Sequence, residues 1–258
     1  MKYFCQILIS IFLSSSSIVV AEDYVNFFTM ENLSKNSSQF YTSERLSRMG
    51  LGFLSMGLVA NSSVDQKIQD WYQQDIRDEK TDLWSKRAKR FGEGEYLLPL
   101  ALLAGGLCYR NRDLSVGRWG LNAAHAYLVG LPPMWTMQYM TGGSRPNESD
   151  DGDSHWQPTQ DDNGVSGHAF VGAVPFLTLA KMANNQKPLQ YLAYAMSVLT
   201  AWSRVNDNAH YTSQAILGWY MAYESVDAVF DRSSEADNLT VSPMVSQQSY
   251  GLVFRLKW

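Results

Sequence analysis

The sequence contains few charged residues and lacks the features of a nucleic-acid-binding or zinc-binding protein. Charged side chains make up 18% of the 258 residues, whereas soluble domains average about 25%. The 21 Lys and Arg are outnumbered by 25 Asp and Glu, and no basic cluster stands out, so we expect no nucleic-acid partner. Four His and two Cys are too few to predict a zinc site, and we expect no cofactor. With 45% hydrophobic residues and a net charge of -4, the chain is predicted to fold around a substantial core.

The N-terminus has the pattern of a secretory signal peptide over residues 1–21. Lys2 precedes an apolar run over residues 4–13, which is too short to span a bilayer of about 30 Å. Val19 and Ala21 supply the small side chains of a cleavage site. We therefore predict export, with a periplasmic or membrane-associated location if the protein is bacterial. Once the signal peptide is cleaved, a single cysteine remains, so no internal disulfide is expected.

Apolar segments of helical length, with few β-branched residues, dominate the chain from residue 95 onward. We predict helices there over residues 96–109, 114–140, 167–183, 188–202 and 212–230. The strongest apolar run, residues 96–109, is short for a membrane span, and Lys181, His125 and Glu224 interrupt others, which is typical of buried helices in a soluble bundle. The predicted fold class is therefore all-α, a single helical bundle that is soluble or peripherally associated with a membrane. A membrane-embedded bundle stays the alternative, because polar residues in membrane helices can line a site.

Residues 22–94, between the signal peptide and this core, are predicted to form an arm and amphipathic helices. Residues 22–48 are polar and aromatic and are expected to be irregular, whereas residues 51–60 form a short apolar helix candidate. Residues 62–90 carry mixed charges around several aromatic side chains, which favours one or two helices that face solvent. The helical core is predicted to occupy residues 95–235.

The C-terminal extension, residues 236–258, is predicted to form a β-hairpin appended to the bundle. Its apolar side chains alternate with smaller or polar ones, as in a half-buried strand. The last strand would carry Tyr250, Leu252, Phe254, Leu256 and Trp258, and its partner Leu239, Val241 and Val245.

Residues 147–164 form an acidic segment with six carboxylates and no Lys or Arg. Its turn-forming residues favour a solvated loop. A cation site is the alternative, although the alternating pattern of a calcium-binding loop is not met.

Three short segments have side chains suited to phosphoryl transfer. Guanidinium groups match phosphate oxygens bidentately and keep their charge. A Ser-Gly turn at a helix start can offer a hydroxyl and backbone N–H groups to the same anion. One imidazole can attack phosphorus while a second protonates the leaving oxygen. The segments are Arg145-Pro146, Ser166-Gly167-His168, and Ser203-Arg204 followed after five residues by His210.

Each segment alone has an ordinary structural interpretation as a turn, a helix cap or a surface residue, and only their combination favours a site. The sequence contains no H-E-x-x-H, no G-x-x-x-x-G-K-[ST] and no G-x-G-x-x-G. The two remaining histidines are expected to be structural. His125 is predicted to be a hydrogen-bonded core residue and His155 an exposed residue of the acidic segment.

This combination resembles the type 2 phosphatidic acid phosphatase (PAP2) superfamily, which also includes bacterial class A acid phosphatases and vanadium haloperoxidases. The family pattern is K-x6-R-P, then P-S-G-H, then S-R-x5-H-x3-D. The resemblance covers about residues 95–230, and the spacing of Ser203-Arg204 to His210 is its most specific part. It implies a PAP2-like helical bundle as the fold.

The resemblance also implies a function, an exported phosphatase that needs no metal and hydrolyses phosphomonoesters or lipid phosphates. By this resemblance His210 forms a phosphohistidine, and His168 protonates the leaving oxygen. Gln214 would orient His210 in place of the family's aspartate. The phosphate-binding residues implied are Gln138, Arg145, Ser166, Gly167 and Arg204.

Three positions depart from the family pattern. Gln138 stands where the first-motif lysine is expected, Val165 replaces the proline of the second motif, and Gln214 replaces the final aspartate. Because the lysine and the aspartate are opposite in sign, losing both can leave the net charge of the pocket unchanged. The alternative is a phosphate-ligand-binding protein with weak or no catalysis. A haloperoxidase is a third hypothesis.

Overall fold

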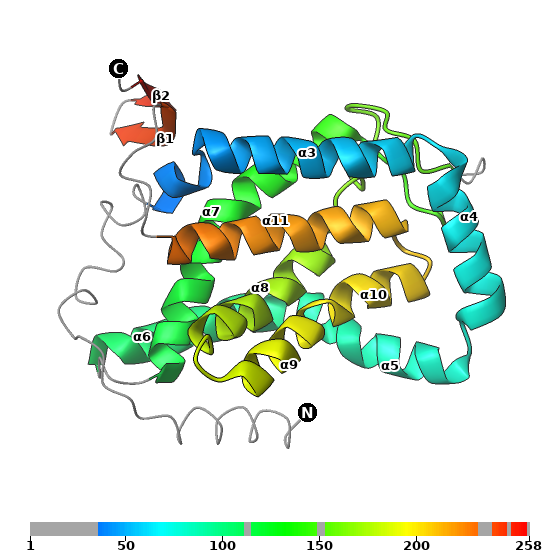
Figure 1. Cartoon of the computed structure of the whole chain (residues 1–258), viewed down its shortest axis with the longest axis horizontal. Helices are drawn as coiled ribbons and strands as arrows, with labels where there is room; N and C mark the ends of the chain where they lie inside the picture. The colour runs from blue at the N-terminus through cyan, green and yellow to red at the C-terminus, as the bar shows by residue number, and fades with distance from the viewer. Residues whose placement is uncertain (1–35, 111–114, 149–152, 232–238, 247–248, 257–258) are drawn as a thin grey trace.

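The protein is a bundle of helices with a two-stranded hairpin at one end, as the computed structural model shows (Figure 1). The N-terminal helices lie on the outside of the bundle, and the helices that carry the three motifs form its centre. The residues that the structure describes are 36–110, 115–148, 153–231, 239–246 and 249–256. The predicted signal peptide and most of the expected arm lie outside these residues.

The elements follow one another in a single run of helices. In chain order they are α3 (Ser43–Ala60), α4 (Ser63–Trp71), the π-helical turn η2 (Tyr72–Ile76), α5 (Glu79–Lys89), the 3-10 turn η3 (Arg90–Gly92), α6 (Gly94–Arg110), α7 (Ser115–Thr141), α8 (Gly167–Met182), α9 (Lys187–Ser197), α10 (Leu199–Asn206), α11 (Thr212–Phe230), β1 (Leu239–Ser246) and β2 (Ser249–Leu256).

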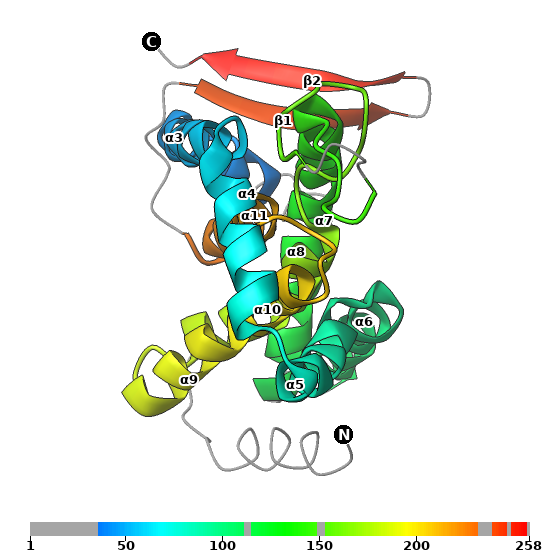
Figure 2. The same cartoon turned by 90° about the vertical axis from the view of Figure 1, so that its right-hand side faces the viewer.

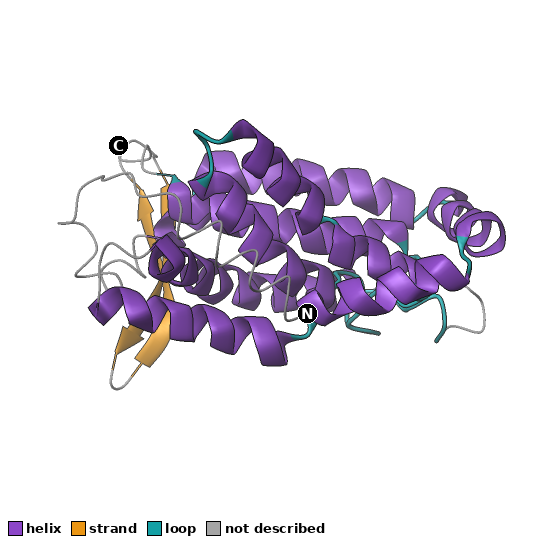
Figure 3. Cartoon of the chain, turned by 90° about the horizontal axis from the view of Figure 1, so that it is seen from below, coloured by secondary structure: helices purple, strands orange, loops and turns teal. Residues whose placement is uncertain are grey.

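Helix α8 is the centre of the bundle. All of its residues from 169 to 180 are buried, as expected for a helix that is apolar on every side. Helices α7, α9, α10 and α11 all pack against it. Seen from below, the helices stack around this centre and the strands lie at one end of the molecule (Figure 3). The all-α fold predicted from the apolar segments is confirmed.

The outer layer is formed by α3, which lies beside α11, and by α4, which leads to α5 at the other side of the bundle (Figures 1 and 2). Residues 36–40 are helical and helix α3 begins at Ser43, so the expectation that residues 22–48 are irregular is wrong for the described residues from 36 onward, apart from the short turn between these two stretches. The start of α3 is stabilised by an N-cap and by an ion pair. Thr42 accepts a hydrogen bond from the Arg45 N–H, and the buried Arg45 side chain binds Glu224 of α11 at 2.7 Å.

The predicted helices of the core match α6, α7, α8 and α11 closely, whereas the segment 188–202 differs. It forms two helices, α9 and α10, which meet at Val198, and α10 continues to Asn206. The hydroxyl of Ser197, at the end of α9, donates to the Tyr194 carbonyl and accepts from the indole of Trp219 in α11. The apolar pattern continues through this junction, so periodicity alone does not reveal the change of helix.

The predicted C-terminal hairpin is confirmed. Strands β1 and β2 pair antiparallel, with Val241 opposite Phe254 and Val245 opposite Tyr250. Trp258 lies outside the described residues. No helix in the described part of the chain is both long and apolar enough to cross a membrane.

Candidate active site

The three motifs occupy the ends of helices that meet around the start of α8. Arg145 lies in the loop after α7, whereas Ser166 caps α8. Arg204 is in the last turn of α10, and His210 lies in the short connection from α10 to α11. Helix ends are where unpaired backbone N–H and C=O groups are available for binding. The fold therefore brings together residues that are separated by up to 65 positions along the chain.

Gln214, in the first turn of α11, connects all three motifs. Its side-chain Nε2 donates to the Ser144 carbonyl at 2.8 Å, beside Arg145. Its backbone carbonyl accepts from the Ser166 N–H at 3.0 Å. Its side-chain Oε1 lies 3.0 Å from Nδ1 of His210. Because the side chain is only 1% exposed, these contacts are made away from water and hold the motifs in a fixed relation.

The amide of Gln214 also determines the protonation of His210. Its Oε1 accepts from the backbone N–H of Tyr211 at 3.1 Å, while its Nε2 donates to the Ser144 carbonyl, so Oε1 is the acceptor that faces the imidazole. Nδ1 of His210 therefore carries the proton and donates it to Oε1, which leaves the lone pair on Nε2. A lone pair on the nitrogen remote from the orienting group is the requirement for a nucleophilic histidine.

The two arginines are held by different contacts. Arg145 donates from Nε to Asn163 Oδ1 at 2.8 Å and forms an ion pair with Glu148 at 3.0 Å. Arg204 forms an ion pair with Asp207 at 3.2 Å. The Nε of Arg204 is buried and has no hydrogen-bond partner among the described residues. A buried donor without a partner is costly, so this group is available for an anion.

Ser166 and Gly167 form the N-terminus of α8. The Ser166 hydroxyl accepts from the Ala169 N–H at 3.3 Å, which is an N-cap contact. Gln138 supports the residue before the cap, because its Nε2 donates to the Val165 carbonyl at 2.8 Å. Gln138 also lies near Gly167. Its amide nitrogen is 3.5 Å from the position that a Cβ atom on Gly167 would occupy. The structure thus places Gln138 against the backbone of the second motif, as well as near the anion site.

Both histidines of the site are neutral in the absence of a ligand. Burial, together with the charges of Arg204 and Arg145, lowers the pKa of His210 to about 3, although the hydrogen bond that His210 donates to Gln214 acts in the opposite direction. Burial also lowers the pKa of His168 to about 4, assisted by the positive charges of Arg204, Lys89 and Arg145. These shared electrostatic effects show that the two imidazoles and the guanidinium groups form one cluster.

We expect the pKa of His168 to rise when an anion binds. A phosphate or vanadate beside the imidazole favours its charged form, so the pKa should increase by about one unit or more. NMR titration of the histidine ring protons with and without vanadate measures this shift. His155 is the control, since it is exposed in the acidic segment and pairs with Asp153. A pKa of His168 that is unchanged by saturating vanadate would contradict the assignment.

The two remaining histidines lie outside the site, whereas the acidic segment contributes Glu148 and Asn163, the partners of Arg145. His155 is exposed, as predicted, and His125 is fully buried with its Nδ1 2.6 Å from the Asn36 amide, as expected of a core histidine. In the acidic segment, Asp161 accepts from the Asn163 amide at 2.7 Å. The described residues contain no group of three or more His, Cys, Asp or Glu side chains placed to hold a metal ion.

Four residues of the site were missed by the sequence analysis. Asn163 holds Arg145, and Asp207 holds Arg204. Lys89 and Glu93 lie far upstream in sequence, but their charges act on His168 and Arg204 respectively. Asp207 was within reach of sequence reasoning, because a carboxylate three positions after an arginine is a common helical ion pair. The placement of the other three depends on tertiary packing.

Comparison with known proteins agrees with this arrangement. The sequence model described as the PAP2 superfamily matches residues 121–231. The fold is similar to the crystal structure of the first transmembrane PAP2 type phosphatidylglycerolphosphate phosphatase from Bacillus subtilis, with a TM-score of 0.54 and 18% identity, over 74% of this chain and 97% of that one. No curated protein matches the chain.

Proposed function

We propose that the protein, whose residues 121–231 match the PAP2 superfamily model, is a phosphatase that works through a phosphohistidine at His210. The observation that carries this proposal is the contact between Gln214 Oε1 and Nδ1 of His210 at 3.0 Å. It leaves the Nε2 lone pair of a neutral imidazole available for attack, next to two guanidinium groups that can bind a phosphate.

The reaction proceeds in two steps on this arrangement. In the first, the Nε2 lone pair of His210 forms a bond to phosphorus and the ester P–O bond breaks. The leaving oxygen keeps the electron pair of that bond and receives a proton from His168. In the second, His168 takes a proton from a water molecule, which attacks phosphorus. The P–N bond then breaks and returns its electron pair to His210, releasing inorganic phosphate.

The positive charge for both transition states comes from the protein side chains. Arg145 and Arg204 face the equatorial oxygens, and the Ser166 hydroxyl and Gly167 N–H add hydrogen bonds at the positive end of the α8 dipole. Bound phosphate also supplies the negative charge that raises the pKa of His168. The rate should therefore fall as the pH increases beyond the pKa that His168 has in the complex, giving an acidic optimum.

A cavity next to the site favours a substrate with an apolar chain. It has a volume of about 1510 Å³ and lies among α5, η3, α6, α9 and α10. Phe91 and Glu93 line it, and the residue between them, Gly92, packs against His168. The cavity and His168 therefore lie on either side of the same short segment, residues 91–93. Most of the other lining residues are apolar or aromatic, namely Trp84, Ala88, Tyr96, Leu97, Leu100, Met196, Leu199 and Trp202, and the polar ones are Asp78, Lys80, Thr81, Arg87 and Arg90.

The surface gives further support for a lipid phosphate as the substrate class. Helix α3 exposes Leu51, Leu54 and Leu58 on one face, with at least 66% of each side chain accessible. Exposed apolar stripes of this kind occur at membrane and protein interaction sites. Peripheral contact with a membrane and export through residues 1–21 are parts of the proposal, and the signal peptide lies outside the described residues.

We expect phosphatidate dispersed in detergent to be hydrolysed with a higher kcat/KM than a small aryl phosphate. Leu100→Glu places a carboxylate in the cavity and should lower kcat/KM for phosphatidate by about tenfold or more, while the aryl phosphate is unaffected. Leu103→Glu is the matched control, because it lies on the same helix, is 72% exposed and does not line the cavity. Equal losses on both substrates, or a preference for the aryl phosphate, would count against a lipid substrate.

A binding protein with weak catalysis is the second candidate. The observation in its favour is that Gln138 and Gln214 both use their amides on backbone carbonyls, Val165 and Ser144 respectively. These contacts hold the motifs together without adding charge to them. Phosphate release from the wild-type protein decides between the two candidates.

A further inference from the structure

The phosphate site has little uncompensated positive charge, because the arginines of the first and third motifs are both paired with carboxylates. Arg145 is paired with Glu148 and Arg204 with Asp207. At the position of the first-motif lysine, Gln138 is neutral and donates to the Val165 carbonyl. A phosphate monoester carries up to two negative charges near neutral pH. Binding it in this pocket therefore requires another cation to balance its charge.

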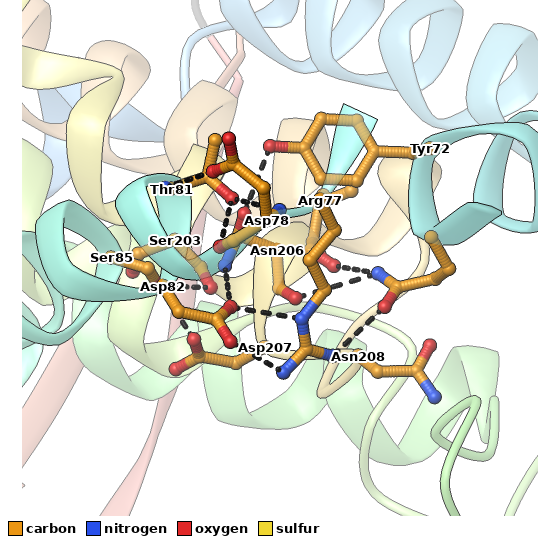
Figure 4. Close-up of polar contacts among 12 residues, drawn as sticks. Tyr72, Arg77, Asp78, Thr81, Asp82, Ser85, Ser203, Asn206, Asp207 and Asn208 are labelled. Atoms are coloured by element: carbon orange, nitrogen blue, oxygen red, sulfur yellow. Dashed lines mark hydrogen bonds and ion pairs between the residues drawn. The ribbon is translucent and has the colours of Figure 1, made fainter. Parts of the chain in front are cut away.

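One face of α5 runs along α10 and reaches the residues around Arg204. Asp82 accepts a hydrogen bond from the Asn206 amide at 2.8 Å. One turn later, Ser85 donates to the Ser203 carbonyl at 3.1 Å and to Asp207, the ion-pair partner of Arg204. Figure 4 shows these contacts side by side. Lys89 is the next residue on this face, because residues three and four positions apart lie above one another on a helix.

The segment that follows Lys89 packs directly against His168. A Cβ on Gly92 would lie 2.7 Å from the His168 carbonyl oxygen and 2.6 Å from the Thr200 methyl group, so this turn tolerates only glycine without rearrangement. Lys89 is therefore bracketed by Ser85, which contacts the partner of Arg204, and by Gly92, which contacts His168. Its charge has a larger effect on the pKa of His168 than that of Arg145.

Lys89 is a partly buried residue, and no carboxylate in the described part of the chain forms an ion pair with it. Arg87, two residues earlier, instead lies over the ring of Trp84 at 4.8 Å. An ordinary role for Lys89 would be to interact with the negative end of the α5 dipole. Lys86, in the same last turn, can serve that purpose equally well.

We propose that Lys89 is the third cation of the phosphate site and replaces, from a different helix, the charge that is missing at Gln138. This inference rests on the proposed function. It assigns to α5, outside the three motifs, a residue that binds the phosphoryl group of the substrate. It also explains how the site can hold a phosphate dianion with a neutral side chain at position 138.

Vanadate affinity and kcat/KM for the same phosphate ester test this assignment in the full-length protein. Loss of one charge-assisted hydrogen bond predicts that Lys89→Gln weakens vanadate binding and lowers kcat/KM by about 10- to 100-fold. Lys86→Gln, which removes the same charge from the same turn of α5, should stay within about twofold of wild type on both measures. In the Lys89→Gln background, Gln138→Lys should recover most of the lost vanadate affinity.

Three results would overturn the assignment. In the first, Lys89→Gln has the same vanadate affinity and kcat/KM as Lys86→Gln. In the second, Lys89→Gln loses vanadate affinity that Gln138→Lys does not restore, which would indicate a structural effect. Both results leave the proposed function intact, because the wild-type protein still binds vanadate and releases phosphate. A wild-type protein that does neither would overturn the proposed function and this inference together. Thermal midpoints of all variants separate unfolding from loss of binding.

Discussion

His210→Ala is expected to reduce phosphate release by at least about 10³-fold, because the substitution removes the atom that bonds to phosphorus. The His168 imidazole lies on α8 and serves the leaving oxygen, so it does not take the place of His210. The measurement is the steady-state rate of phosphate release under saturating substrate, with the purified variant and wild type compared at equal concentration.

The fold should survive this substitution. Gln214 Oε1 keeps its second donor, the Tyr211 N–H at 3.1 Å, so no buried acceptor is left without a partner. The thermal midpoint of His210→Ala should therefore show a cooperative transition like that of the wild-type protein. His155→Ala is the control for loss of an imidazole, and it should retain full activity. A His210→Ala protein that is folded and turns over at the wild-type rate would remove the basis of the assignment.

Gln214→Leu is expected to lower kcat by about 10²- to 10³-fold. The substitution removes the acceptor that keeps the proton on Nδ1 of His210, so the imidazole can take the tautomer with its proton on the attacking nitrogen. In the serine-protease triad, changing the residue with this orienting role costs about 10⁴ in kcat, largely through the wrong tautomer. The expected loss is smaller here because Gln214 is neutral and contributes orientation without charge.

Gln69→Leu is the matched control for Gln214→Leu. Gln69 is also a buried glutamine, and it donates to the Val205 carbonyl in the last turn of α10 and to Asn208 in the connection between α10 and α11. It contacts no histidine of the site, so its removal should change kcat only a few-fold while lowering the thermal midpoint. Equal losses in kcat for the two variants would show that Gln214 acts through the structure of the connection and not through His210.

The pair Gln214→Asp with Gln138→Lys, which restores the family residues, separates the two candidate functions. If the wild-type protein is a competent enzyme, the restored charges should raise kcat/KM by less than about tenfold, because the existing contacts already orient His210. A large gain from an inactive wild-type protein would instead identify a phosphate-binding protein whose catalysis was lost at these two positions.

Much of the fold follows from the apolar pattern of the sequence. The long apolar segments become α6, α7, α8 and α11 because each is either buried on all sides or packed on one face, and both situations leave a readable signal. The division between α9 and α10 at Val198 leaves none, since the apolar residues continue through the junction. The start of α3 depends on the ion pair between Arg45 and Glu224, which are 179 residues apart.

Some residues of the site could also be predicted from the sequence, whereas others could not. The motif residues could be identified from the sequence because catalysis restricts their types and spacing, and the structure places them around the start of α8. The partners of Gln138 and Gln214 could not be predicted, because both amides bind backbone carbonyls of other segments. Lys89 lies on a charged amphipathic helix that is indistinguishable in sequence from any solvated one. Its approach to His168 is inferred from the packing of Ser85 and Gly92, which precede and follow it in the chain.

Trapping the covalent intermediate distinguishes attack by His210 from direct attack of water on the substrate. A substrate labelled in its phosphoryl group, mixed rapidly with the protein and quenched in alkali, should leave label on the wild-type chain in a bond that acid hydrolyses, as expected of a phosphohistidine. Peptide mapping should place that label on His210, and the His210→Ala protein should carry none. A wild-type protein that turns over without any labelled intermediate, or a label that persists in His210→Ala, would contradict the mechanism.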